Sequence, residues 1–173
     1  MGNTYSQVYI QTVFPVKYRQ ALISKYWKEP LMAVMGNLIN ETGCRTLIVN
    51  GVEDHVHCFF RMKPSISISE VMKSVKAKSS KWVNENKLTD VRFEWQPGFG
   101  CFSYAQSQYD SVFHYIKNQE KHHQKRSFRN EYLELLDRFG IDYDEKHIFS
   151  GTNLKLDSPY LRHFLVYRLI NTE

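Results

Sequence analysis

The sequence has few cysteines and lacks the short cysteine patterns that bind zinc or form disulfide frameworks. Its three cysteines, Cys44, Cys58 and Cys101, are far apart, and no CxxC pair occurs among the 173 residues. This excludes a disulfide scaffold and a thiolate zinc site, and a reducing compartment is expected. No apolar run approaches the roughly 18 residues that span a membrane, and no secretion signal opens the chain. We therefore expect a soluble, cytoplasmic protein with no membrane partner.

The chain also lacks a glycine-rich phosphate-binding loop, so an ATP-driven activity is not indicated. It is too short for a (β/α)₈ barrel, which needs roughly 200 residues or more. Hydrophobic residues make up 42% of the chain and aromatic residues 14%, enough to bury a core. We expect a single domain over residues 1–173, with its core at about 5–147 and a C-terminal tail at about 148–173.

Four segments have the composition and alternation of β-strands. They are the stretch from Val8 up to Pro15, residues 44–50, residues 55–62 and residues 93–104. The second and third are joined by a few turn-forming residues, which predicts an antiparallel hairpin. The fourth contains a proline and two glycines, so it should be bent or divide into a strand and a loop.

Four segments have helical spacing of apolar residues. They are residues 19–42 with a break or restart at Pro30, residues 68–83 after the capping-box pair Ser67 and Glu70, a helix capped by Ser107 and Asp110 that runs to about His123, and residues 128–139. Residues 160–170 fit a short strand or a helix. The order β-α-β-β-α-β followed by helices predicts an α+β, ferredoxin-like two-layer sandwich. Its four-stranded antiparallel sheet would carry helices on one face, with an additional C-terminal helix.

Two histidines in the third predicted strand are candidate metal ligands. His55 and His57 project from the same face of a strand, whereas Val56 points to the other face. An isolated pair of this kind is more often structural. A metal site needs at least one more ligand, which leaves open a zinc site with a third protein ligand or an Mg²⁺ or Mn²⁺ site with an oxygen ligand.

A tyrosine and a glutamine on the third predicted helix are the next candidates. Tyr115 and Gln119 are four residues apart, so they would lie one turn apart on the same helix face. A cation beside a phenol favours the phenolate and polarises a phosphate, which is what tyrosine attack on a phosphodiester requires. The same spacing is equally compatible with two surface side chains.

Four blocks in this order and spacing resemble the single-tyrosine HUH transposases of small insertion sequences (insertion-sequence 200/605 type, including repeat-associated tyrosine transposases). The blocks are GVEDHVHCFF, ISEVMKSVKAKSSKWV, WQPGFGCFS and YIKNQEKHH. The resemblance implies that His55 and His57 are the HUH ligands, Tyr115 the nucleophile and Gln119 the third ligand. Asp54 and His114 flank them and are candidates for orienting a ligand, with a place on the surface as the alternative for His114.

The resemblance also implies an RNA-recognition-motif-like core with a tyrosine-bearing helix, Mg²⁺ or Mn²⁺ as cofactor, a homodimer, and a bacterial or archaeal cytoplasm. The implied activity is a DNA transposase that cleaves and rejoins single-stranded DNA at hairpin-marked element ends through a covalent 5′-phosphotyrosine. Alternatives are a domesticated repeat-associated relative that acts on chromosomal palindromes, a non-catalytic nucleic-acid-binding module of the same fold, and a metal-dependent hydrolase of small phosphoesters.

The placement of charge supports a nucleic-acid partner. The chain has 23 Lys and Arg against 18 Asp and Glu, a net charge of +5. Residues 61–87 alone carry a net charge of +5, and residues 117–129 carry +4 beside Tyr115. A solvated helix face explains any single lysine equally well, but the group indicates phosphate contacts. The candidates are Arg61, Lys63, Lys73, Lys76, Lys78, Lys81, Lys117 and Lys121.

Overall fold

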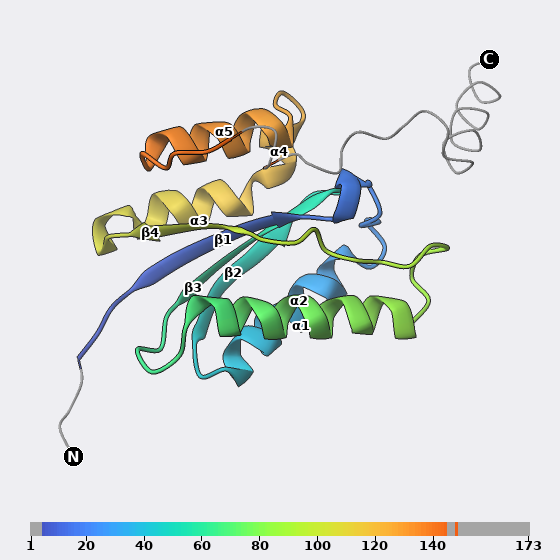
Figure 1. The fold of residues 1–173 in the computed structure, drawn as a ribbon, viewed down its shortest axis with the longest axis horizontal. Helices are drawn as coiled ribbons and strands as arrows, with labels where there is room; N and C mark the ends of the chain where they lie inside the picture. Colours follow the sequence, from blue (N-terminus) through green and yellow to red (C-terminus); the bar gives the residue numbers. More distant parts are fainter. Residues whose placement is uncertain (1–4, 145–147, 149–173) are drawn as a thin grey trace. The chain divides into compact units, whose positions relative to one another are not determined.

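In the computed structural model, four antiparallel strands form a sheet in the order β2-β3-β1-β4 (Figure 1). The strands are β1 (Tyr9–Pro15), β2 (Arg45–Gly51), β3 (His55–Arg61) and β4 (Gly100–Tyr104). Strand β1 is central because it pairs with β3 on one side and with β4 on the other. The predicted ferredoxin-like α+β sheet is therefore confirmed, and so is the β2–β3 hairpin.

The helices cover both faces of this sheet (Figure 1). They are α1 (Lys28–Glu41), α2 (Ile68–Glu85), α3 (Tyr109–Lys117), α4 (Gln119–His123) and α5 (Phe128–Arg138), with short 3₁₀ turns η1 (Lys17–Arg19) and η2 (Gln106–Gln108). Helices α1 and α2 lie on one face and complete the two-layer sandwich. The tyrosine-bearing helix α3 lies on the opposite face, together with α4 and α5.

The structure describes residues 5–144 and 148. The described residues up to Asp142 form one compact unit. The expected element at residues 160–170 lies outside the described residues, and a single domain extending to residue 173 stays a prediction. Within the described part, no helix is long and apolar enough to cross a membrane.

Strand β3 separates the hydrophobic core from the candidate site by its two-residue alternation. Val56, Cys58 and Phe60 are fully buried in the main core, together with apolar residues of α1 and α2. His55, His57 and Phe59 face the other way. Phe59 packs with residues of α3, so the histidine face is also covered rather than open to solvent. This explains why every residue of β3 except Arg61 is buried.

Two helices differ from the sequence predictions in where they begin or end. The first helix begins at Lys28, and Pro30 lies in its first turn, where the missing N–H of proline has no helical partner to lose. The predicted Ser107 cap is wrong: Ser107 lies in η2, and α3 begins after Gln108 without a side-chain cap. The third helix also stops early, because Asn118 leaves helical geometry and its side chain bonds to the His114 carbonyl.

The capping box of α2 provides a test of these local structures. The Ser67 hydroxyl accepts from the Glu70 N–H, and the Glu70 carboxylate accepts from the Ser67 N–H. We expect Ser67→Ala to lower the free energy of unfolding by about 1 kcal/mol, measured by chemical denaturation. The matched variant Ser107→Ala should change it by less than about 0.5 kcal/mol. A loss at Ser107 equal to that at Ser67 would contradict the observed start of α3.

Candidate active site

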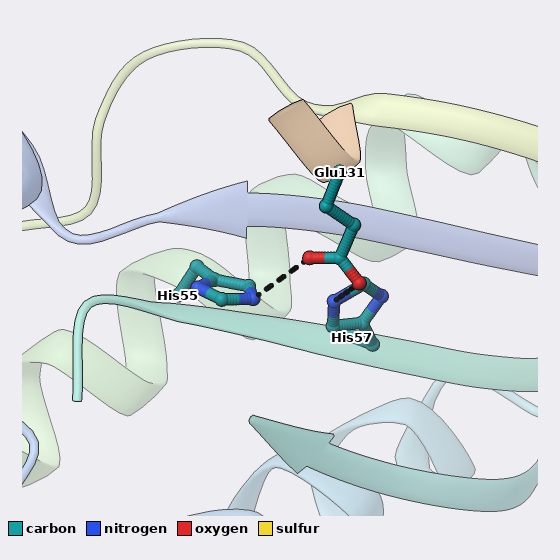
Figure 2. A group of neighbouring side chains, drawn as sticks. All are labelled: His55, His57 and Glu131. Carbon is teal, nitrogen blue, oxygen red and sulfur yellow. Dashed lines mark ion pairs between the residues drawn. The ribbon is translucent and has the colours of Figure 1, made fainter. Parts of the chain in front are cut away.

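The two histidines begin β3, directly after the hairpin turn. Gly51 makes this turn possible, because a Cβ at that position would collide with the His55 carbonyl oxygen. Both imidazoles are completely buried, and their ring centroids lie 5.2 Å apart. As predicted from the alternation, they share one face of the sheet, and both rings face α5 (Figure 2).

A carboxylate that the sequence did not predict lies between them. Glu131 of α5 is only 2% exposed, and Figure 2 shows its side chain reaching from the helix to the histidines. Its Oε2 lies 3.2 Å from His55 Nε2, and its Oε1 lies 3.5 Å from His57 Nε2. His123 Nε2 is 2.8 Å from Oε2. A signal was present in the sequence, since Glu131 interrupts the apolar helix stripe that contains Phe128 and Leu135.

Tyr115 and Gln119 meet the same carboxylate from α3 and α4. The Tyr115 hydroxyl donates to Glu131 Oε1, and Gln119 Nε2 donates to that oxygen at 2.9 Å. The Tyr115 ring centroid is 6.0 Å from that of His57. The four predicted site residues are thus brought together, although the helix break at Asn118 separates the tyrosine from the glutamine.

Each imidazole is held in orientation through its Nδ1 atom. His55 Nδ1 lies 2.7 Å from Asp54 Oδ1, the neighbour that the sequence indicated. His57 Nδ1 lies 2.9 Å from the side-chain amide of Gln11, whose Oε1 accepts from the Tyr104 hydroxyl at 2.6 Å. The Asp54 carboxylate takes the Nδ1 proton of His55 and so directs its Nε2 towards a ligand, whereas the Gln11 amide donates to His57 Nδ1 and fixes that ring. Gln11 was not predicted, and its buried place on the central strand is visible only in the fold.

The site residues have shifted pKa values with identifiable causes. Burial lowers the pKa of His57, and Glu131 offsets this only in part, so its imidazole is held neutral. Burial also opposes the charged form of His55, but the neighbouring Asp54 and Glu131 carboxylates outweigh it and raise its pKa. For Glu131, the surrounding histidines overcome the effect of burial and lower the pKa. Burial and the Glu131 charge both raise the pKa of Tyr115, which is therefore a phenol.

The residues present fit a divalent cation. His55 Nε2, His57 Nε2 and Gln119 Oε1 are buried and make no hydrogen bond, although such atoms are rarely left unpaired. One ligand atom from each of His55, His57 and Glu131 lies within 4.8 Å of the others. Neutral imidazole nitrogens with carboxylate and amide oxygens are donors that first-row divalent ions accept. A buried metal site is therefore available to this chain.

The predicted DNA contacts occupy three separate places. Lys73, Lys76, Lys78 and Lys81 lie on α2, across the sheet from the histidines. Three of these are engaged elsewhere. Lys78 pairs with Glu41 and Lys81 with Glu85. Lys76 donates to backbone carbonyls, and burial lowers its pKa to about 8.

The remaining predicted contacts lie on the strands and on the tyrosine segment. Lys117 ends α3 and Lys121 lies in α4, both exposed and close in sequence to Tyr115. Arg61 and Lys63 lie at the other end of β3 from His55. These assignments as DNA contacts stay predictions. A hollow of about 530 Å³ opens beside the site and is lined in part by Asp54, His123 and Phe128.

A family model described as "Transposase IS200 like" matches residues 4–119, about two thirds of the sequence. The chain belongs to the IS200-like transposase family. The matched range includes both histidines, Tyr115 and Gln119, and it ends before α5 and Glu131. Transposition is the activity of this family. No curated protein matches the sequence.

Two solved structures resemble this transposase in fold. A proposed transposase from Deinococcus radiodurans R1 has a TM-score of 0.56 and 17% identity, covering 69% of this chain and 96% of that chain. A REP-associated tyrosine transposase bound to a REP hairpin has a TM-score of 0.51 and 15% identity, covering 71% of this chain and 74% of that chain. At these identities the likeness establishes the fold of the transposase.

Metal binding tests the role of Glu131. We expect Glu131→Gln to weaken Mn²⁺ binding by about tenfold or more in calorimetric titration, because removing even the outer partners of a metal site costs about 10- to 100-fold. The control is Glu134→Gln, one turn further along α5, where the carboxylate pairs with Arg126 and Arg138 at the surface. Equal Mn²⁺ affinity in wild type and Glu131→Gln would exclude the carboxylate as a ligand.

Proposed function

We propose that this transposase cleaves and rejoins single-stranded DNA through a covalent bond between DNA and Tyr115. The observation that carries the proposal is the convergence of Tyr115, Gln119 and both histidine Nε2 atoms on one buried carboxylate. A tyrosine that only covered the surface would not contact a buried carboxylate that also contacts two histidines. The arrangement supplies a nucleophile, a proton acceptor and metal ligands within one small volume.

In the proposed reaction, the Tyr115 oxygen attacks the scissile phosphorus and the bond from phosphorus to the 3′ oxygen breaks. The hydroxyl proton leaves along its hydrogen bond to Glu131 Oε1 and passes on to water, because the lowered pKa of Glu131 prevents the carboxylate from keeping it. The departing oxygen takes up a proton and becomes a free 3′-hydroxyl, while the phosphate stays on the 5′ end as phosphotyrosine. Attack by another 3′-hydroxyl reverses these steps and rejoins the DNA without ATP.

His55, His57 and Glu131 would hold a divalent cation, with Gln119 as a further oxygen ligand; Mg²⁺ or Mn²⁺ is the expected ion. When bound, the cation would polarise the phosphate and offset the charge that develops on it. Asp54 and Gln11 would keep the two imidazoles aimed at it. Burial favours this role for His57, because it lowers the pKa and a metal competes with protons for the imidazole.

Access to this centre requires a movement. Both histidines and Gln119 are fully buried, and Glu131 is nearly so. A DNA phosphate can meet the ligands and Tyr115 only if the α4–α5 segment shifts away from β3. The hollow beside Asp54 and His123 marks the side from which the strand would enter.

Hairpin-bearing DNA is the proposed partner. The likeness to a transposase bound to a REP hairpin supports it, together with the exposed Lys117 and Lys121 beside Tyr115. The homodimer expected from the resemblance stays a prediction. A domesticated role on chromosomal palindromes would use the same chemistry and the same residues.

The decisive test is formation of the covalent adduct. A hairpin-bearing oligonucleotide from the DNA flanking the gene, labelled at its 3′ end and incubated with Mn²⁺, should become attached to the wild-type chain on a denaturing gel. Tyr115→Phe should form no adduct, because it lacks the attacking oxygen.

The matched control is Tyr132→Phe, a half-buried tyrosine on α5 that packs against Phe128. It should form the adduct at the wild-type level. An adduct in Tyr115→Phe would show that another residue is the nucleophile. Cleavage without any adduct would instead indicate metal-dependent hydrolysis.

A further inference from the structure

Two neighbouring hollows at the far end of β3 have no acidic residue in their walls. The larger, of about 630 Å³, is lined by Tyr5, Arg45, Arg61 and Lys63 among others. The smaller, of about 220 Å³, shares both arginines and adds Tyr109. By contrast, acidic side chains line the hollow beside the histidines and the one along α2. The two neighbouring hollows therefore form one continuous cationic surface.

Strand register places the arginines together. Arg45 of β2 is the direct partner of Arg61 of β3, and Tyr9 of β1 is the partner of Arg61 on its other side. Directly paired residues of antiparallel strands point to the same face, and like charges in such a pair are destabilising. Neither arginine forms an ion pair with any residue in the described part of the chain. Their pairing therefore opposes folding stability and favours binding of an anionic ligand.

The chemistry of the surface suits a phosphate. Each guanidinium offers a planar set of donors that matches two phosphate oxygens, and Lys63 adds a third positive charge. Tyr5 is 90% exposed on the rim of the same hollow, where its ring is available to stack on an unpaired base. This combination of cations and an exposed aromatic ring favours a single strand over a duplex.

The position of the surface relates it to the proposed reaction. Arg61 lies four residues after His57 on the same face of β3, which is about 13 Å at roughly 3.3 Å per residue. At a duplex-like rise of about 3.4 Å per nucleotide this corresponds to about four nucleotides, and to fewer if the strand is extended. Because α3 covers the face between them, a strand that reaches both places passes around α3 and follows a longer path than this straight distance.

We propose that Arg45 and Arg61, with Lys63, bind a backbone phosphate of the unpaired DNA strand a few nucleotides from the phosphate attacked by Tyr115. We call these three residues the arginine site. The inference rests on the proposed function for the identity of the strand. It adds Arg45, which no sequence pattern indicated, to the predicted contacts Arg61 and Lys63, and it assigns all three to single-stranded rather than hairpin DNA.

The test measures equilibrium binding without metal, so that no cleavage occurs. Fluorescence anisotropy with an unstructured single-stranded oligonucleotide is recorded over a range of salt concentrations. We expect Arg45→Gln/Arg61→Gln to weaken binding. The slope of log affinity against log salt should also fall by about 0.7 for each phosphate of the single strand that the variant no longer neutralises. Binding to a blunt hairpin should change much less.

The matched control is Lys87→Gln/Arg92→Gln, which removes the same charge from the segment that follows α2. It should keep the wild-type affinity for the single strand. Thermal unfolding adds a second measurement: Arg45→Gln/Arg61→Gln should melt at the wild-type temperature or higher, because a like-charge pair is removed. If the arginines had a purely structural role, this variant would melt at a lower temperature than the wild type.

The outcomes separate this inference from the proposed function. Unchanged single-strand affinity in the arginine variant, an equal decrease in the control, or an equal decrease on the blunt hairpin would overturn the arginine site, even if the Tyr115 adduct forms. No measurable binding of the single strand by the wild type would overturn it as well. A decrease in binding confined to the arginine variant would support the site, even if no adduct is found.

Discussion

Polar groups from β3, α3 and α4 all meet one buried carboxylate, that of Glu131 on α5. A charge in this position is costly unless it is surrounded by donors, and here His123, Gln119 and the Tyr115 hydroxyl supply them. The hydrogen bonds that offset the free-energy cost of burying this charge come from neighbouring helices. The same hydrogen bonds therefore hold these helices over the histidine face. The proposed chemistry and the packing of α3–α5 therefore depend on a single group.

Strand β3 carries both the core and the proposed activity, because its alternation assigns one role to each face. The side with Val56, Cys58 and Phe60 anchors α1 and α2. The other side has the histidines at its first end and Arg61 at its last. Pairing with β2 completes both ends: Gly51 allows the tight approach at the histidines, and Arg45 is placed opposite Arg61.

The sequence predicted the strands, the α2 capping box and the grouping of His55, His57, Tyr115 and Gln119. The grouping is correct, but its physical cause is not the continuous helix that the spacing predicted. Helical spacing placed Tyr115 and Gln119 one turn apart, yet the helix breaks at Asn118 and both side chains still meet at Glu131. Helical spacing predicted that the two side chains lie close together. In the structure they are close because both donate to the Glu131 carboxylate.

Local patterns along the chain were enough to predict the β2–β3 hairpin and the side of β3 on which the histidines lie, because alternation and hairpin length act between neighbouring residues. Family blocks indicated the roles of the histidines and the tyrosine. The tertiary structure alone decided that Glu131 joins them, that Gln11 orients His57, and that Arg45 lies beside Arg61. These contacts join residues far apart in sequence, and their partners are set by packing and strand register rather than by any short-range preference.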